Sequence, residues 1–151
     1  MRGNRSRDTI PELKIRSALH ALGLRFRVHA RPVPTIARRA DVVLRGARIA
    51  VFIDGCFWHG CPDHYRPPAT NQAYWHPKID ANRHRDRDTD ERLRVAGWTP
   101  LRIWEHEPVP DAVSRIRARM AAGASAELRA GDRRCAAPPV TPSGRASTPP
   151  S

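Results

Sequence analysis

The first regular pattern along the chain is an apolar stripe with helical spacing that precedes Gly23. Its members recur at positions i, i+3, i+4 and i+7, and they are Ile15, Ala18, Leu19 and Leu22. The segment Thr9-Ile10-Pro11-Glu12 has the form of a capping box, with Thr9 at the N-cap and Glu12 at N3. Glycine is favoured just beyond a helix C-terminus. The pattern therefore predicts an amphipathic helix that begins after Thr9 and ends before Gly23.

Three short strand patterns follow this helix. Residues 25–29 (RFRVH) alternate, and residues 40–44 (ADVVL) are rich in β-branched side chains. Residues 48–53 (RIAVFI) are almost continuously apolar, as expected for a strand buried on both faces. Because Gly46 lies between the last two segments, we expect them to form a hairpin.

The next segment predicts a polar helix, one more strand and a short helix. Residues 75–96 contain only a thin apolar stripe, chiefly Ile79, Leu93 and Ala96. Residues 98–105 (WTPLRIWE) predict a strand, and residues 111–120 predict a last helix. The predicted order, α-β-β-β-α-β-α, indicates a small mixed α/β domain.

The composition changes at about residue 121. Residues 121–151 are rich in Ala, Pro, Ser, Gly and Arg, so we expect a disordered tail after a domain that spans residues 1–120. The sequence contains neither a signal-peptide pattern nor a long apolar span, and its three cysteines do not suggest a disulfide framework. We expect a soluble intracellular protein, in which Cys135 of the tail has no assigned role.

The charge balance narrows the choice of partners. The chain has 27 Lys and Arg residues against 15 Asp and Glu residues, which gives a net charge of +12. Such a charge favours a polyanion, most simply nucleic acid, although a GC-rich genome would also enrich Arg. In the polar helix, we interpret the charged positions as a solvated face rather than as phosphate contacts; they are Arg83, Arg85, Asp86, Arg87 and Asp88.

Two carboxylates at strand ends suggest a metal-dependent nuclease. Asp41 begins one strand of the expected hairpin, and Asp54 follows the other about a dozen residues later. Two such ligands can hold Mg²⁺ against a scissile phosphate, whereas the alternative for Asp41 is a turn residue. The lysine that usually follows the second acid is replaced by Cys56. The capping box alone explains Glu12, although its carboxylate could point at the same site.

The loop DGCFWHGCPDHY, residues 54–65, concentrates soft metal ligands. Cys56, Cys61 and His64 fit three positions of a structural zinc site, which needs a fourth. We prefer His106 because it ends the last strand, next to the loop; the other candidates are His59, His76 and His84. The alternative is a metal-free loop with two buried cysteines and an exposed histidine.

One aromatic pair lies in this loop and a second pair follows it in the chain. Phe57 and Trp58 are adjacent, and Tyr74 and Trp75 form a second pair. A rigid loop cannot easily turn both members of a pair into one core, so they could act as a wedge between DNA bases; a local mini-core is the alternative. His59 follows the wedge and could be the general base for an attacking water, although a loop histidine is more often merely solvated.

These segments together closely resemble the very-short-patch repair (Vsr) mismatch endonucleases. The likeness spans about residues 3–107 and includes NRSRDTIPELKIRSALHALGLRFRVH, RRADVVL, the GCFWHGC loop and GWTPLRIWEHE. It implies a restriction-endonuclease-like fold of the PD-(D/E)XK type, with a mixed sheet flanked by helices and a structural zinc. It also implies a Mg²⁺-dependent endonuclease that nicks DNA on the 5′ side of the T in T·G mismatches, which arise by deamination of 5-methylcytosine.

The resemblance also implies residue roles. Asp41 and the backbone carbonyl of Ile53 match the Mg²⁺ ligands, and Glu12 matches an acidic residue that supports the hydrated metal. His59 matches the catalytic histidine, which accounts for the missing lysine. The zinc ligands match Cys56, Cys61, His64 and His106. The aromatics that enter the DNA stack match Phe57, Trp58 and Trp75.

Three positions depart from the family pattern. Asp54 stands where the best-known member has a histidine, so this candidate catalytic residue could bind metal directly or act behind the ligands. His106 stands in place of a cysteine, which makes the zinc set Cys2His2. Ala40 precedes Asp41 where proline is common.

Two alternatives to mismatch nicking stay open: a restriction-type or general nuclease of the same fold, and a non-catalytic zinc-bearing DNA-binding module. The expected substrate is double-stranded DNA with a T·G mismatch. We expect a monomer in the bacterial cytoplasm, associated with the nucleoid and not with a membrane. Mismatch-repair proteins are candidate partners.

Overall fold

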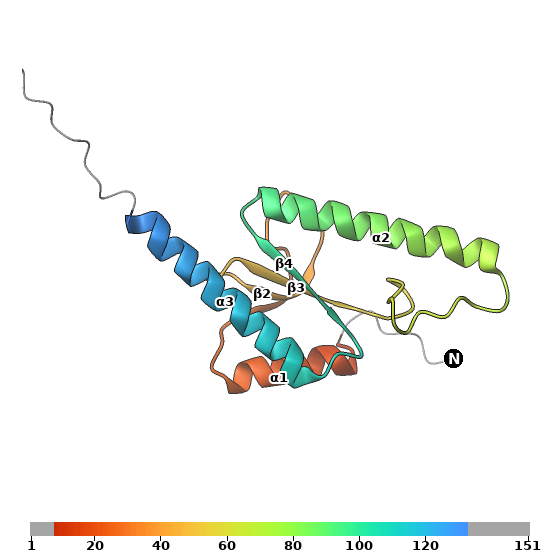
Figure 1. Ribbon diagram of the computed structural model, residues 1–151, viewed down its shortest axis with the longest axis horizontal. Coiled ribbons are helices and arrows are strands. Elements are labelled where there is room, and N and C mark those ends of the chain that lie inside the picture. Colours follow the sequence, from red (N-terminus) through yellow and green to blue (C-terminus); the bar gives the residue numbers. More distant parts are fainter. Residues whose placement is uncertain (1–7, 133–151) are drawn as a thin grey trace, which may run out of the picture.

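Strands β2 (Ala40–Leu44) and β3 (Ile49–Asp54) form the hairpin that the sequence predicts. Strand β1 (Arg27–Ala30) pairs antiparallel with β2, and β4 (Thr99–Trp104) pairs parallel with β3. The computed structural model, which describes residues 8–132, thus contains a mixed sheet with the strand order β1-β2-β3-β4 (Figure 1).

Helices cover both faces of this sheet. Helices α1 (Ile10–Ala21) and α3 (Val109–Asp132) pack on one face, and α2 (Gln72–Val95) lies across the other (Figure 1). A parallel strand pair needs a crossover connection, and α2 provides it between β3 and β4. The predicted element order is confirmed. Within residues 8–132, no helix has the length and apolar character that a membrane crossing requires.

The alternation of side chains along β3 separates two cores. Ile49 and Val51 pack in the core beneath α1 and α3, whereas Ala50 and Phe52 pack on the α2 side. Successive side chains of a strand point to opposite faces of the sheet. Asp54 continues the second series, so the carboxylate at the end of β3 faces α2.

The ends of α1 match the sequence prediction, but its capping differs in detail. The helix starts after Thr9, and Gly23 beyond its C-terminus has a φ of +71°. The Thr9 hydroxyl donates to Glu12 Oε1 at 3.0 Å instead of capping a backbone N–H. The backbone N–H of Asp8, rather than that of Thr9, donates to Glu12 Oε2 at 3.0 Å. The reciprocal capping box is therefore wrong, although the helix start is right.

The last helix is longer than the sequence predicts. Helix α3 continues past Met120 to Asp132, so the short helix expected over residues 111–120 is wrong in its C-terminal end. The end of the domain at residue 120 stays a prediction. Residues 1–7 and 133–151, and with them Cys135 and most of the predicted tail, lie outside the described residues.

Candidate active site and metal centre

The hairpin, the loop after β3 and helix α2 line one polar cleft with a volume of about 240 Å³. The hairpin contributes Asp41 and Ile53, the loop contributes His59, and α2 contributes Asp86. Positive charge comes from arginines that also line the cleft, among them Arg38, Arg39 and Arg85. The cleft therefore combines the carboxylates of Asp41 and Asp54, a histidine–aspartate pair and cationic groups, which suits chemistry on an anionic substrate.

Asp41 lies near the start of β2, where its carboxylate meets the backbone of β3. The N–H of Ile53 donates to Asp41 Oδ2 at 2.7 Å. Burial raises the pKa of Asp41 to about 6; the carboxylates of Glu12 and Asp54 add to this effect, and the Ile53 hydrogen bond opposes it. A divalent cation would stabilise the ionised form, and carboxylate oxygen is the ligand that Mg²⁺ prefers. The residues present thus fit a magnesium site.

His59 forms a pair with Asp86 of α2. His59 Nδ1 lies 2.5 Å from Asp86 Oδ2. Burial lowers the pKa of His59, but the hydrogen bond to Asp86 and the charge of Asp54 outweigh burial and raise it above its usual value. The same contact and Arg102 lower the pKa of Asp86 although burial opposes them. An aspartate that holds Nδ1–H leaves Nε2 as the nitrogen that can accept a proton.

Two side chains of α2 hold the backbone of the loop. Asn82 Nδ2 donates to the carbonyl of Trp58 at 2.9 Å. Arg83 donates to the next two carbonyls, from Nε to His59 at 3.3 Å and from Nη2 to Gly60 at 2.6 Å. Gly60 has a φ of +61°, and the Arg83 guanidinium occupies the space that a Cβ there would need. Three successive carbonyls around His59 are therefore fixed by one helix.

Asp54 pairs with Arg102 of β4 and is only 5% exposed. Arg102 Nη1 donates to both oxygens of Asp54, at 3.0 and 2.9 Å. Burial raises the pKa of Asp54 although Arg102 and His59 oppose it. Asp54 also lies 3.8 Å from His59 Nδ1, farther than Asp86 does.

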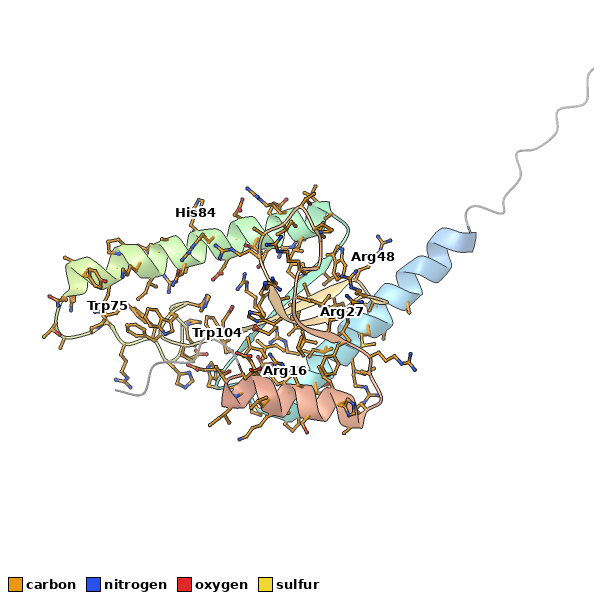
Figure 2. All side chains as sticks on the ribbon, turned by 180° about the vertical axis from the view of Figure 1, so that it is seen from behind. Arg16, Arg27, Arg48, Trp75, His84 and Trp104 are labelled. Carbon is orange, nitrogen blue, oxygen red and sulfur yellow. The ribbon has the colours of Figure 1, made fainter. Side chains whose placement is uncertain are left out.

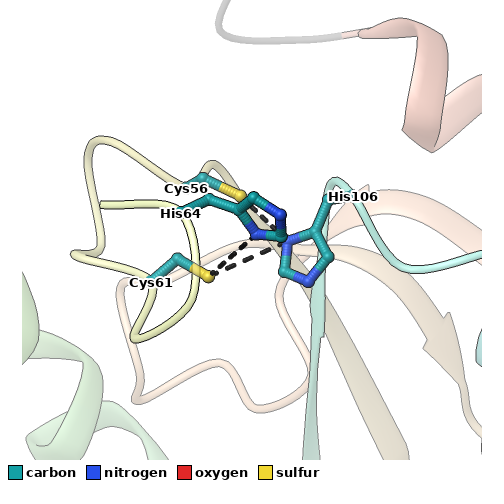
Figure 3. A group of neighbouring side chains, drawn as sticks. All are labelled: Cys56, Cys61, His64 and His106. Atoms are coloured by element: carbon teal, nitrogen blue, oxygen red, sulfur yellow. Dashed lines mark hydrogen bonds between the residues drawn. The ribbon is translucent and has the colours of Figure 1, made fainter. Parts of the chain in front are cut away.

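A second cluster lies where the loop meets the end of β4 (Figure 3). Its ligand atoms all lie within 4.8 Å of one another, and they belong to Cys56, Cys61, His64 and His106. His106 Nδ1 is 3.0 Å from Cys56 Sγ and 3.8 Å from Cys61 Sγ, and His64 Nδ1 is 3.8 Å from Cys61 Sγ. A tetrahedral zinc site places its sulfur and nitrogen ligand atoms about 3.6 Å apart, a separation close to the two longer contacts, whereas the Cys56–His106 contact is shorter. The four side chains thus fit zinc.

The cluster is where the sequence predicts it, and His59 is not among its members. The backbone N–H of Cys56 donates to Glu105 Oε1 at 2.7 Å, which ties the loop to the chain just beyond β4. Burial, together with the neighbouring Cys61, raises the pKa of the Cys56 thiol to about 11. Zinc binds the thiolate, so metal binding here would be coupled to proton release.

Glu12 lies beside the cleft rather than in its lining. It is 4% exposed, and Arg16 Nη2 donates to its Oε2 at 2.8 Å. Its charge nevertheless contributes to the raised pKa of Asp41. Glu12 is thus both a structural residue of α1 and an electrostatic neighbour of the site.

The aromatic residues form one cluster between the loop and α2. Phe57, Trp58 and Trp75 meet edge to face, with ring centroids 5.2–5.7 Å apart. Trp58 is 40% exposed and the adjoining Tyr74 is 55% exposed. Figure 2 shows Trp75 at the end of the molecule away from Arg27 and Arg48. The cluster is thus both a small core and a partly exposed apolar surface.

Several residues of α2 that the sequence does not assign to the site contact it in the structure. The solvated-face interpretation is wrong for Arg83, which binds the loop, and for Asp86, which binds His59. A signal existed, because buried and site-facing positions recur at helical spacing: Ile79, Asn82, Asp86, Thr89 and Leu93. The apolar stripe is thin because polar residues of the cleft occupy its middle.

Comparison with known proteins points to one group of nucleases. The family model described as DNA mismatch endonuclease Vsr matches residues 1–65. The chain is 48% identical over 118 residues to the Type II nicking enzyme V.NaeI of Lentzea aerocolonigenes, a match that covers 77% of this chain and 71% of that protein. It is 39% identical over 104 residues to the Type II nicking enzyme V.XorIIP of Xanthomonas oryzae pv. oryzae, covering 68% of this chain and 74% of that protein.

Two further similarities agree with this group. DNA mismatch endonuclease Vsr of Escherichia coli (strain K12) is 39% identical over 106 residues, covering 70% of this chain and 66% of that protein. Among solved structures, the catalytic domain of the homing endonuclease I-Bth0305I superposes with a TM-score of 0.52 at 15% identity. That match covers 77% of this chain and 98% of the other, and it supports a nuclease fold.

Proposed function

Since this chain belongs to the Vsr family of DNA mismatch endonucleases and is a DNA endonuclease, we propose that it nicks duplex DNA on the 5′ side of the T in a T·G mismatch. The proposed reaction depends on Mg²⁺. The observation that carries the proposal is the cleft in which the buried carboxylate of Asp41 lies beside the His59–Asp86 pair.

His59 is the proposed general base. Its Nε2 would take a proton from the attacking water, while Asp86 holds Nδ1–H and stabilises the imidazolium that forms. Asp86 is thus a positioning residue that acts through His59. The carbonyl contacts from Asn82 and Arg83 would restrict the movement of His59 during this step.

The proposed magnesium ligands are the Asp41 carboxylate and the Ile53 backbone carbonyl. Bound Mg²⁺ would neutralise charge on the scissile phosphate and stabilise the leaving oxygen. Asp41 supplies negative charge in a site where burial disfavours it, which favours cation binding. Glu12 on α1 would add negative charge near Asp41 and assist the hydrated ion.

The proposed role of zinc is structural. Cys56, Cys61, His64 and His106 would hold it and so fix both ends of the segment that carries Phe57, Trp58 and His59. Metal analysis of the purified protein should find about one equivalent of zinc per chain. Its absence would remove this part of the proposal.

The aromatic cluster is the proposed wedge. Phe57, Trp58 and Trp75 would enter the base stack beside the mismatch, at a cost in unstacking that is lower for a mispaired base. The partial exposure of Trp58 supports this role. Replacing Trp58 by alanine should then reduce the preference for mismatched over matched DNA more than it reduces binding to duplex DNA.

A nicking assay tests the whole proposal. The substrates are pairs of duplexes, in several flanking contexts, that differ only in carrying a T·G mismatch or a T·A pair. With Mg²⁺, the T strand of the mismatched duplex should be nicked and the matched duplex should not. Asp41→Ala should abolish it, whereas the exposed Asp88→Ala on α2 serves as the matched control. Equal nicking by wild type and Asp41→Ala would contradict the site.

A second candidate function deserves the same assay because several relatives are named Type II nicking enzymes. Equal nicking of matched DNA would favour a restriction-type or general endonuclease of the same fold. Retained DNA binding without cleavage in any divalent metal would favour a non-catalytic zinc-bearing module. We also propose that the protein is a monomer, that it lies in the cytoplasm in association with the nucleoid, and that it contacts mismatch-repair proteins.

A further inference from the structure

Arg102 connects the central sheet to α2 through acidic side chains that surround His59. Its Nη1 donates to both oxygens of Asp54 and lies 3.3 Å from Asp86 Oδ1. Its Nε donates to both oxygens of Asp90 at 3.1 Å. Its Nη2 donates to Asp90 Oδ1 at 3.0 Å and to the backbone carbonyl of Asp86 at 3.3 Å. One guanidinium thus contacts three carboxylates on two elements.

The fold explains how these groups meet. In the parallel register of β3 and β4, Phe52 pairs with Arg102, and Asp54 lies two residues farther along on the same face as Phe52. The Arg102 guanidinium lies 4.9 Å from the centroid of the Phe52 ring, which supports it from the sheet side. Asp86 and Asp90 lie one turn apart on α2, so both face Arg102.

The charges in this region would repel one another without Arg102. Asp54, Asp86 and Asp90 all contact Arg102, and a protonated His59 would contact Asp54 and Asp86. Asp54 is nearly inaccessible to water, and a buried charge whose partner is removed is strongly destabilising. The guanidinium therefore compensates the charge of the buried Asp54 and fixes the orientation of its carboxylate.

An unrestrained Asp54 would disturb two features of the cleft. Its carboxylate already lies 3.8 Å from His59 Nδ1, so a small rotation would let it compete with Asp86 for the ring. It also directly follows Ile53, whose backbone meets Asp41. An additional free carboxylate there would offer a cation a competing ligand.

We infer that Arg102 is a positioning residue for the nicking reaction and that Asp54 is its counter-ion rather than a ligand of the catalytic metal. Arg102 binds both oxygens of Asp54, which occupies the carboxylate with a partner other than a cation, and keeps Asp86 aligned with His59. The predicted effect on kcat rests on the proposed function. The prediction that Asp54 does not bind the metal can be tested without it.

The test compares Asp54→Asn, Arg102→Gln and the double variant with wild type. Arg92→Gln is the matched control, because Arg92 forms an exposed ion pair with Asp88 on the same helix. The readouts are kcat and KM for nicking, Mn²⁺ binding to the protein alone by paramagnetic resonance, and the thermal unfolding midpoint. Total nicking is scored on both matched and mismatched duplexes.

We expect Arg102→Gln to lower kcat about 10- to 100-fold with little change in KM, as for other residues that orient catalytic groups. Asp54→Asn should retain Mn²⁺ binding close to wild type, in contrast to Asp41→Asn, which should lose it. The double variant should recover at least about five-fold in kcat over Arg102→Gln, because it removes the uncompensated carboxylate together with its partner. Arg92→Gln should match wild type.

Two results would overturn the inference. If Asp54→Asn loses Mn²⁺ binding as Asp41→Asn does, Asp54 is a metal ligand. If the double variant is no more active than Arg102→Gln, Arg102 does not act through Asp54. Should Arg102→Gln unfold, recovery of the unfolding midpoint in the double variant tests the same pairing. Wild-type nicking of matched DNA would contradict the proposed function alone, since metal binding and total nicking do not depend on mismatch preference.

Discussion

The charge of Asp41 should destabilise the metal-free protein at neutral pH, so that Asp41→Asn should be more stable than wild type, although we expect the variant to lose DNA nicking. Burial raises the pKa of Asp41 from an ordinary 3.8 to about 6. The folded chain therefore holds this proton more tightly than the unfolded chain does. The asparagine is neutral at every pH, and its side-chain oxygen can still accept the hydrogen bond from the N–H of Ile53.

The size of the effect follows from this difference in proton affinity. The raised pKa of Asp41 costs the folded state almost no stability well below pH 3.8, and the loss of folding free energy grows until the pH exceeds about 6. At about 1.4 kcal/mol for each tenfold change in affinity, the full penalty is about 3 kcal/mol at pH 7.5. It is about 1.5 kcal/mol at pH 5. For a domain of this size, the larger value corresponds to a rise of about 10 °C in the unfolding midpoint of Asp41→Asn.

Urea unfolding of both proteins between pH 5 and 8, without added Mg²⁺ and with both proteins purified in the same way, measures this difference. The control is Asp88→Asn, which neutralises an exposed carboxylate of α2 and should change stability by less than about 0.5 kcal/mol. Adding Mg²⁺ should stabilise wild type and leave Asp41→Asn unchanged. An advantage of Asp41→Asn that does not grow with pH, or a loss of stability at pH 7.5, would refute the reasoning.

Three further outcomes test the other parts of the site. Asp86 raises the pKa of His59, and a general base must be deprotonated, so nicking by wild type should decline as the pH falls through that raised pKa. Asp86→Asn should shift this decline to lower pH and reduce the maximal rate. An unshifted pH profile would show that Asp86 does not act through His59. Cys61→Ser should abolish the proposed zinc binding and unfold at lower temperature, as measured by metal analysis and calorimetry. An unchanged zinc content would exclude Cys61 as a ligand. Gly60→Ala should displace Arg83 and cost about 1–3 kcal/mol in urea unfolding, because it places a side chain at positive φ where the guanidinium lies; wild-type stability would show that this contact is dispensable.

Local patterns in the sequence predicted most of the architecture. The β2–β3 hairpin follows from two apolar segments around Gly46, and the start of α1 follows from Thr9 and Pro11. The four side chains of the cysteine–histidine cluster were also predicted, because three lie within a few residues and His106 follows a strand end. The end of α3 was not, since the Ala-rich sequence after Met120 is compatible with a helix as well as with a tail.

The sequence itself determined the order of elements and the hairpin, because each depends on residues that are close in the chain. It likewise determined the candidate site residues Asp41 and His59 and the cysteine–histidine loop. The contacts of Asp86 and Arg102 were decided only by the tertiary structure. A charged residue on a helix looks the same in sequence whether it faces water or a cleft. Only the passage of α2 across the sheet brings Asp86 to His59 and sets Arg102 between Asp54 and Asp90, and that packing depends on contacts between segments far apart in the chain.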